Sequence, residues 1–355
     1  MKRRHFLASA AALATTPGLT GWAAAGAPDV ISAANRPDKS TWLVGLQADG
    51  TLCFQLPLPG RGHGATPHPT RAEVVGFARR PGRFAVVLDC VTGRERARII
   101  SPPGRHFYGH GAFSSDGNLL FATENNYDDL TGTIGIYDAD RAYRRVGELP
   151  SGGLGPHEIL RREEGGFVVA NGGIQTHPDM PRARLNIPSM QSSLVYLDAK
   201  GMLEEQVFLP ENMQKNSIRH IDIATDGAVL MALQWQGNPL DDVPLVARHK
   251  RGEEITLLTH PEQRQLKNYA GSIACAPHDG GFAITGPKGS VVIYFDAEGQ
   301  PAGARSLGTA SGVARSRAGG LIISCDGGLF HHGPLGDHFT PVAGEWAWDN
   351  HLIAV

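Results

Sequence analysis

The 355-residue sequence lacks the motifs that identify several common classes of enzyme. It has no GxSxG nucleophile motif, no HExxH zinc motif and no phosphate-binding GxxxxGK[ST] loop. It has only four cysteines, and no two of them are spaced as a CxxC or zinc-binding pair. Covalent catalysis by serine or cysteine therefore has no support. Because all four cysteines lie in or beside apolar strand patterns, we expect buried free thiols.

The sequence also lacks long apolar runs, a strong net charge and extended helical periodicity. No run approaches the 18 apolar residues of a membrane-spanning helix. The net charge is -2, which points to neither nucleic acid nor an anionic membrane surface as a partner. What it has in abundance is 45 glycines and 24 prolines, which favour many short strands and turns.

The N-terminus reads as a targeting segment. A basic start, Met1-Lys2-Arg3-Arg4, precedes an apolar, alanine-rich run and then a string of small residues. This order is typical of an export signal, and the Arg-Arg-x-Phe-Leu core is similar to that of a twin-arginine signal. We therefore expect a signal peptide over residues 1–27, a single domain over 28–355 and a periplasmic location.

The most informative feature is a short phrase built around a histidine. It recurs at His63, His110, His157 and His220, with spacings of 47, 47 and 63 residues, and each copy opens a weak strand pattern. A period of about 40–50 residues made of short strands is typical of a β-propeller.

Counting strands along the chain gives an all-β fold, a seven-bladed β-propeller. Six blades follow one another from the first phrase onward. The seventh is expected to combine two strands from each terminus, Thr41–Leu46 and Thr51–Leu56 with Glu345–Trp348 and His351–Val355. The last two would be joined by a turn at Asp349-Asn350. Such closure removes the exposed sheet edges of an open ring.

In a propeller the first strand of each blade lines the central channel, so the four repeated histidines should converge at one channel mouth. The ends of the second strands and the longest loops share that face. The candidate site residues there, besides the histidines, are Arg105, Glu124, Glu158, Asn171, His177, Arg219 and Gln234. Six further histidines share no register, and we interpret them as turn or strand-surface residues: His260, His278, His331, His332, His338 and His351.

Several neutral imidazoles around one axis can serve different purposes. They can hold a metal ion, iron or copper in particular, with Glu124 or Glu158 adding an oxygen. They can equally face a haem edge or an organic anion, or act in proton transfer. A histidine repeated at one blade position can also be structural, bonding the backbone of a neighbouring blade.

The sequence around these histidines resembles that of an exported bacterial family, the domain of unknown function 1513. The resemblance rests on Arg105–Ser114 (RHFYGHGAFS), Thr123–Asn125, Gly155–Glu158, the stretch from Ala170 to Pro178, and Ile218–His220. It implies a place in iron-related gene clusters, beside imelysin-like and di-haem periplasmic proteins as possible partners. It supplies no reaction and no established catalytic residues.

These expectations leave three functional hypotheses. The first is a periplasmic binding or accessory protein for iron acquisition or metal handling, which takes a metal or metal complex. The second is a metal-dependent or lactonase-like enzyme acting on a small molecule, with a histidine as general base. The third is a scaffold that presents one face to proteins of an iron-uptake system.

Overall fold

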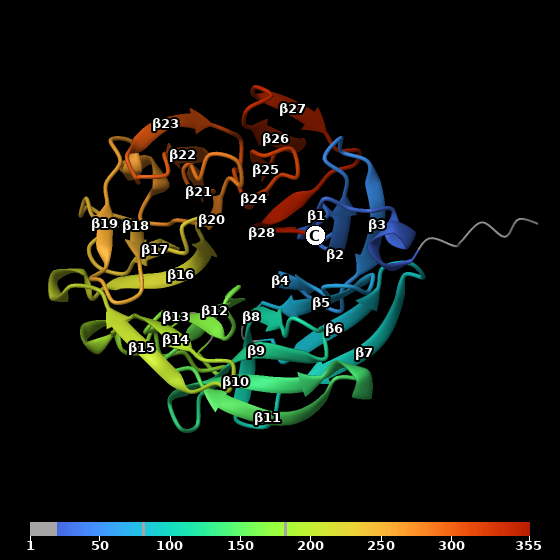
Figure 1. Ribbon diagram of the computed structural model, residues 1–355, viewed down its shortest axis with the longest axis horizontal. Helices are drawn as coiled ribbons and strands as arrows, with labels where there is room; N and C mark the ends of the chain where they lie inside the picture. The colour runs from blue at the N-terminus through green and yellow to red at the C-terminus, as the bar shows by residue number, and fades with distance from the viewer. Residues whose placement is uncertain (1–19, 80–81, 181–182) are drawn as a thin grey trace, which may run out of the picture.

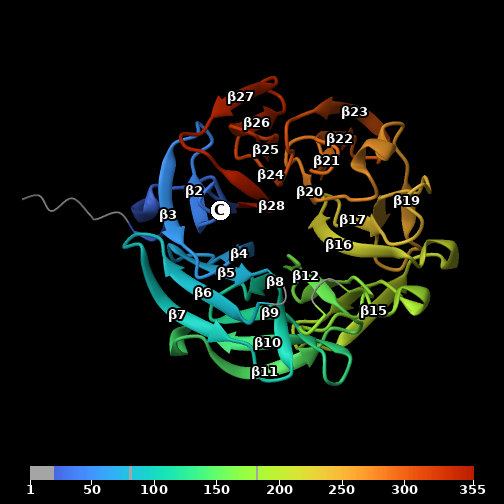
Figure 2. The ribbon, with the colours of Figure 1, turned by 180° about the vertical axis from the view of Figure 1, so that it is seen from behind.

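The computed structural model describes residues 20–79, 82–180 and 183–355 and forms a seven-bladed β-propeller. Seven four-stranded antiparallel sheets stand side by side in a closed ring (Figures 1 and 2). The predicted fold class is therefore confirmed, as is the closure of the last blade by both termini.

The blades are numbered in chain order from the first repeated phrase, and their strands are given from the innermost outward. The first two blades are β4 (Gly62–Pro67), β5 (Glu73–Ala78), β6 (Phe84–Asp89) and β7 (Arg94–Ile100), then β8 (Arg105–Phe113), β9 (Leu119–Asn126), β10 (Thr131–Asp138) and β11 (Arg144–Pro150). The third and fourth are β12 (Pro156–Arg161), β13 (Phe167–Asn171), β14 (Ser193–Leu197) and β15 (Leu203–Phe208), then β16 (Asn216–Ile223), β17 (Val229–Trp235), β18 (Val246–His249) and β19 (Thr256–Leu258).

The last three blades complete the ring. They are β20 (Ser272–Cys275), β21 (Phe282–Gly286), β22 (Val291–Phe295) and β23 (Pro301–Ser306), then β24 (Val313–Arg315), β25 (Leu321–Cys325), β26 (Gly328–His332) and β27 (His338–Pro341), and finally β28 (Ala347–Ala354), β1 (Val30–Asn35), β2 (Thr41–Leu46) and β3 (Leu52–Pro57). The described residues also form five short 3-10 helices, one before the first strand and four between strands: η1 (Gly21–Ala25), η2 (Ala139–Arg141), η3 (Ile187–Ser189), η4 (Glu211–Met213) and η5 (Gln263–Leu266).

The closing blade differs from the prediction in its strand count. The C-terminus contributes one strand and the N-terminus three, so the expected division of two and two is wrong. The apolar, glycine-free stretch at β1 was missed. The expected turn at Asp349-Asn350 is instead an irregularity inside the continuous strand β28. Asp and Asn favour turns, but here they belong to a bulge.

The hydrophobic core lies between neighbouring blades rather than at one centre. Phe77 of the first blade packs with Phe107 and Tyr137 of the second in one buried cluster, and similar clusters join the other blades. Alternation along each strand places one apolar face against each neighbour. The ring is thus held by face-to-face packing of blades, which frees the channel for polar side chains.

The expected export segment lies largely outside the described residues. Residues 1–19 are among those not described, while Trp22 of η1 donates a hydrogen bond to the backbone oxygen of His68 at 2.9 Å. Export and the domain boundary at residue 27 stay predictions. Within the described part of the chain, no helix is both long and apolar enough to span a membrane. All four cysteines are free, as expected, although Cys53 is only half-buried.

Candidate metal centre

Five histidines from five inner strands meet in the central channel. They are His63, His110, His157, His220 and His351, and each is at most 7% exposed. Neighbouring ring centroids lie 4.2–5.6 Å apart. The four histidines predicted to converge do converge. The interpretation of His351 as a turn or surface residue is wrong, because this imidazole is buried within the cluster.

Every histidine of this cluster sits beside a β-bulge. In β12, for example, Pro156 pairs with Asn171 and Glu158 with Ala170, so His157 is an extra residue without a partner in the pairing. Comparable shifts occur at His63 in β4, His110 in β8, Arg219-His220 in β16 and Asp349–His351 in β28. The inner strands β20 and β24 have no such shift and carry no histidine at the channel. A bulge re-aims a side chain, and here it turns each imidazole into the channel.

Two glycines of the repeated phrases allow the rings to approach closely. Gly109 has a φ of +104°, and a Cβ there would lie 2.4 Å from Cδ2 of His63. A Cβ on Gly64 would lie 2.4 Å from the backbone oxygen of Gly109 and 3.1 Å from Nδ1 of His110. The Gly-His-Gly wording is thus explained by packing of one phrase against the next.

The buried Asp349 and the partly buried Glu158 orient three of the imidazoles. Nδ1 of His63 lies 3.1 Å from Oδ1 of Asp349. The two oxygens of Glu158 lie 3.3 Å from Nδ1 of His110 and 3.4 Å from Nδ1 of His220. A carboxylate beside one nitrogen fixes the ring, as is usual around histidine-bound metals. It leaves Nε2 of His110 without a partner among the described residues, whereas Nε2 of His63 lies 3.2 Å from Nε2 of His351.

Burial lowers the pKa values of four of the five imidazoles, those of His63, His157, His220 and His351. The pKa of His63 falls to about 3, against the opposing effect of Asp349. Burial, followed by the neighbouring histidines, holds the pKa values of His157 and His351 well below the usual range. Burial alone would raise the pKa of Glu158, but the attraction of His110 and His220 holds it below its ordinary value. These four imidazoles are therefore held neutral beside ionised carboxylates, the protonation states that metal binding requires.

Several nitrogens face the interior without a hydrogen-bond partner among the described residues. Nε2 of His110 and Nδ1 of His157 are buried atoms of this kind. Three groups have ligand atoms within 4.8 Å of one another: His63, His110 and His157; His110, His220 and His351; His63, Asp349 and His351. Unsatisfied buried polar atoms are rare and destabilising, so their concentration here calls for a ligand.

Two cavities of about 160 Å³ each border the cluster on different sides. The first lies where the inner strands begin and is lined by His63, Arg79, Tyr108, His157, Arg219, His220, Gln234 and Tyr269. The second lies further along the inner strands and includes Glu158, His220, Asp222, Ser272, Arg315 and His351. The first cavity carries two arginines, while the second carries two carboxylates and one arginine.

The other predicted site residues divide into two sets. Glu158 joins the cluster, and Arg219 and Gln234 line the first cavity. Glu124 and Arg105 lie elsewhere, in an ion-pair network with Arg145 and Glu148.

Asn171 and His177 also lie outside the cluster. Asn171 is buried in the third blade, where it donates to the backbone oxygen of Ser151 at 2.9 Å. His177 lies in a partly exposed loop, with its ring 5.1 Å from that of Tyr127. The sequence placed these residues on the correct face of the blades but could not show where their side chains bond.

Asp349 and His351 are the site residues that the sequence did not suggest. Their signal, Asp-Asn-His, lacks the glycines of the other phrases and was interpreted as a turn. Its place in the inner strand of the last blade, where four other inner strands carry a histidine, is the clue that could have found them.

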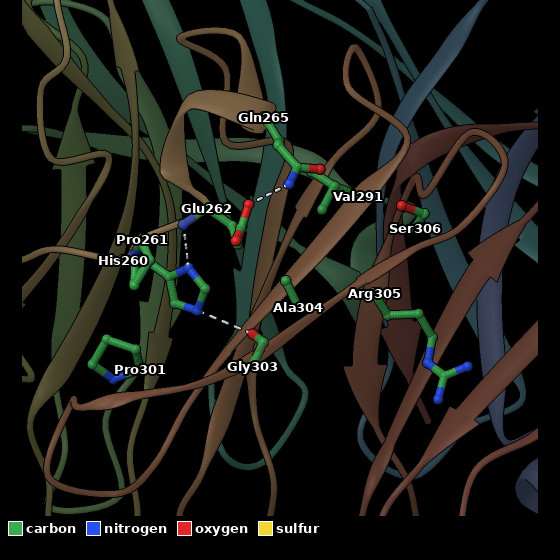
Figure 3. Close-up of a pocket in the computed structure, with 10 residues that line it drawn as sticks. All are labelled: His260, Pro261, Glu262, Gln265, Val291, Pro301, Gly303, Ala304, Arg305 and Ser306. Atoms are coloured by element: carbon green, nitrogen blue, oxygen red, sulfur yellow. Dashed lines mark hydrogen bonds between the residues drawn. The ribbon is translucent and has the colours of Figure 1, made fainter.

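A larger cavity, of about 480 Å³, lies away from the cluster. It is formed by η5, the loop before it and the outer strand β23 (Figure 3). Nε2 of His260 donates a hydrogen bond to the backbone oxygen of Gly303 at 3.0 Å, and its Nδ1 accepts one from the backbone nitrogen of Glu262 at 3.0 Å. Its polar groups are occupied by the protein itself, so size alone does not identify the site.

Comparison with known proteins gives the family and the fold. Residues 56–355 match the family described as "Protein of unknown function (DUF1513)", and the chain belongs to this family. No curated protein sequence matches the chain.

Among solved structures, hydrazine synthase of Kuenenia stuttgartiensis is similar with a TM-score of 0.61 and 13% identity, over 95% of this chain and 100% of that chain. Streptogramin B lyase has a TM-score of 0.58 and 13% identity, over 84% and 91%. A functionally unknown protein from Desulfotomaculum acetoxidans DSM 771 has a TM-score of 0.54 and 12% identity, over 90% and 99%. At such identities the likeness concerns the fold alone.

Proposed function

We propose that this protein is a binding protein that holds one divalent transition-metal ion in the five-histidine cluster, and that it serves iron acquisition or metal handling in the periplasm. The observation that carries the proposal is the buried convergence of five imidazoles, three of which are oriented by Asp349 and Glu158. A purely structural role would leave each ring nitrogen bonded to the protein, whereas Nε2 of His110 has no partner among the described atoms.

The spacing of the donors suits a single ion. Two nitrogens that are each about 2.1 Å from one ion can be at most about 4.2 Å apart. The candidate donor atoms lie within 4.8 Å of one another, so a small inward movement of the rings suffices. Any two of the three candidate groups have one histidine in common, which is His63, His110 or His351. This overlap favours one ion over several.

The donor chemistry is compatible with iron and with copper. Imidazole suits copper, iron, zinc and nickel, and the affinity order of divalent ions puts copper highest. Family membership leads us to expect iron as the ion handled by this protein, in keeping with the gene-cluster context expected above. Ring centroids only 4.2–5.6 Å apart leave no room for a porphyrin among the imidazoles, which argues for a metal ion rather than haem.

The test is metal binding by the purified domain. Metal-free protein is titrated with Cu²⁺, Fe²⁺ under anaerobic conditions, and Zn²⁺, and protein isolated from the periplasm is analysed for metal content. We expect one equivalent to bind and His110→Ala to weaken the affinity at least a hundredfold, because His110 belongs to two of the three candidate groups. His332→Ala, which removes a partly exposed histidine bonded to Asp337, is the matched control.

Binding that survives both His110→Ala and His157→Ala unchanged would refute the proposal. Thermal unfolding of each metal-free variant shows whether a loss of binding reflects a loss of fold. The expected imelysin-like and di-haem partners stay predictions, to be tested by co-purification.

A metal-dependent enzyme is the second candidate. It is favoured by one observation, the polar cavity that borders His63, His157 and His220 and could admit a small substrate. It predicts turnover that requires the bound metal and disappears in His110→Ala. A substrate screen that detects turnover only in the metal-free protein would contradict it.

A further inference from the structure

The two cavities beside the histidine cluster have opposite electrostatic character. Arg79 and Arg219 line the first, and no carboxylate lines it. Glu158 and Asp222 line the second, where Arg315 is already bound to Asp222 at 2.6 Å. An anion that approaches the cluster is therefore attracted through the first cavity and repelled from the second.

Charge balance around a bound ion leads to the same side of the cluster. The guanidinium groups of Arg61 and Arg79 lie 3.7 and 3.2 Å from the carboxylate of Asp349, and Arg219 lines the same cavity as Arg79. A divalent ion in the cluster would add two positive charges beside these arginines, and burial of unbalanced charge is costly.

The first cavity offers donors that can hold the balancing anion. Arg219 is 7% exposed and lies at the bulge of β16 directly before His220. The hydroxyl of Tyr269 accepts a hydrogen bond from Asn350 at 2.7 Å, so its own proton can be donated to a ligand. Arg79 bonds Asp349 with one nitrogen at 3.2 Å and has further N–H groups. Guanidinium groups pair with carboxylate and phosphate oxygens with favourable geometry.

The size of the cavity limits the ligand. Its volume of about 160 Å³ is roughly that of five water molecules, at about 30 Å³ each. This is well below the roughly 300–1,000 Å³ of sites for drug-sized ligands. An anion of four to six non-hydrogen atoms (roughly) fits such a volume, whereas a siderophore or citrate does not.

We propose that the first cavity is a binding site for a small oxyanion, a carboxylate or phosphate group, which binds together with the metal and completes its coordination from the side of Arg79 and Arg219. The inference rests on the proposed metal site, because the uncompensated charge of the ion is what the anion balances. It identifies the protein as one that takes up a metal with a small anion, rather than a bare ion or a large chelate.

The test is calorimetric titration of copper-loaded and metal-free protein with three probes: oxalate, inorganic phosphate and citrate. Bound copper is measured after each titration to exclude its removal by the probe. We expect oxalate or phosphate to bind the loaded protein at least tenfold more tightly than the metal-free protein, and citrate to bind neither. Oxalate preferred over phosphate identifies a carboxylate as the natural class, and the reverse preference identifies a phosphate.

Two arginine variants separate a specific site from general attraction. Arg219→Gln should weaken anion binding to the loaded protein at least tenfold, which corresponds to about 1.4 kcal/mol. Arg305→Gln, at the 480 Å³ cavity, should change it less than twofold. Equal effects of the two variants, or no oxalate and phosphate binding to copper-loaded protein, would overturn the inference. Failure of the metal site itself is distinct, because wild-type protein would then bind no copper in anion-free buffer.

Discussion

Two arcs of the same ring differ in how their inner strands are built. The histidine arc comprises the inner strands β28, β4, β8, β12 and β16, each with a bulge at its histidine. The plain arc comprises β20 and β24, whose pairings are regular. Both arcs share one blade architecture, so the site does not follow from the propeller fold.

The side chains of the two arcs also have different partners. In the plain arc, Ser272 accepts a hydrogen bond from the backbone nitrogen of Val313 at 3.2 Å, and Thr285 donates to the backbone oxygen of Ser311 at 2.5 Å. The histidine arc has such hydroxyl bonds as well, since Thr66 of β4 donates to the backbone oxygen of Gly111 in β8 at 2.9 Å, but its imidazoles also lie against carboxylates. Hydroxyl groups thus join neighbouring blades in both arcs, and only the bulged histidines add ring nitrogens that a ligand could use. The difference teaches that local irregularity, inserted strand by strand, turns a structural channel into a candidate site.

Acid should destabilise the histidine arc most. The folded-state pKa values of His63, His157, His220 and His351 are lowered, chiefly by burial. Between pH 6.5 and the folded-state values, the unfolded chain binds more protons, so stability falls as the pH falls. We expect the metal-free protein to lose on the order of several kcal/mol between pH 7 and pH 5, measured by urea unfolding.

Asp222, which is paired with Arg315 of the plain arc, contributes to the pH dependence of stability with the opposite sign. Burial raises its pKa, so protonation in acid relieves a penalty of the folded state. It therefore cannot account for acid lability. His157→Gln should make the pH dependence of stability shallower, and a flat unfolding free energy from pH 7 to pH 5 would contradict the assignment.

Gly109→Ala should disrupt the histidine arc next most strongly. The new Cβ would collide with the ring of His63 at a φ of +104°. We expect a loss of about 3–5 kcal/mol in unfolding free energy, from backbone strain plus overpacking, together with weaker metal binding. Gly165→Ala is the matched control, since its φ is +101° but a Cβ there meets nothing within 4 Å. Similar losses in the two variants would show that φ alone, not the contact between phrases, requires glycine.

Glu158→Gln should affect ligand binding more than folding. The glutamine can still accept the hydrogen bond that the backbone nitrogen of Ile221 donates at 2.8 Å, but it removes the charge that orients His110 and His220. Loss of such an orienting carboxylate typically weakens metal affinity about 10–100-fold. Copper titration measures this, with Glu204→Gln on the outer strand β15 as the control. An unchanged affinity would show that the carboxylate does not act through the imidazoles.

Ser272→Ala, in the plain arc, should have the smallest effect. It removes one hydrogen bond between blades, worth about 1 kcal/mol of unfolding free energy. Metal affinity should stay within twofold of the wild type. A tenfold loss of affinity would show that the plain arc takes part in the site and that the comparison between the arcs is mistaken.

Much of the fold could be predicted because its signals are local and repeated. The repeated histidine motif and the regular turns predicted seven blades, closure by both termini and the convergence of four histidines. The division of the last blade failed because Asp349-Asn350 has the composition of a turn. Only the pairing with β1 makes it a bulge.

The side-chain partners of the site depend on contacts between distant segments and could not be predicted in the same way. Glu124 and Glu158 look alike in sequence, each just beside a strand position near the channel mouth. Glu124 is fully buried against Tyr137, Arg105 and Arg145 within its own blade, whereas Glu158 reaches two histidines of neighbouring blades. Which face of a bulged strand a side chain occupies is set by the irregular register, which periodicity does not reveal.

The strand β28 both closes the ring and brings Asp349 and His351 to the cluster. Beside it the C-terminus lies next to β1 (Figure 1). A ligand bound by His351 together with His63 or His110 would therefore cross-link the last strand to the first two blades. Occupancy would stabilise the closed ring by mass action, and a chain that has not yet added its final strand would lack a complete site. Loading and completion of the ring would thus be one event rather than two.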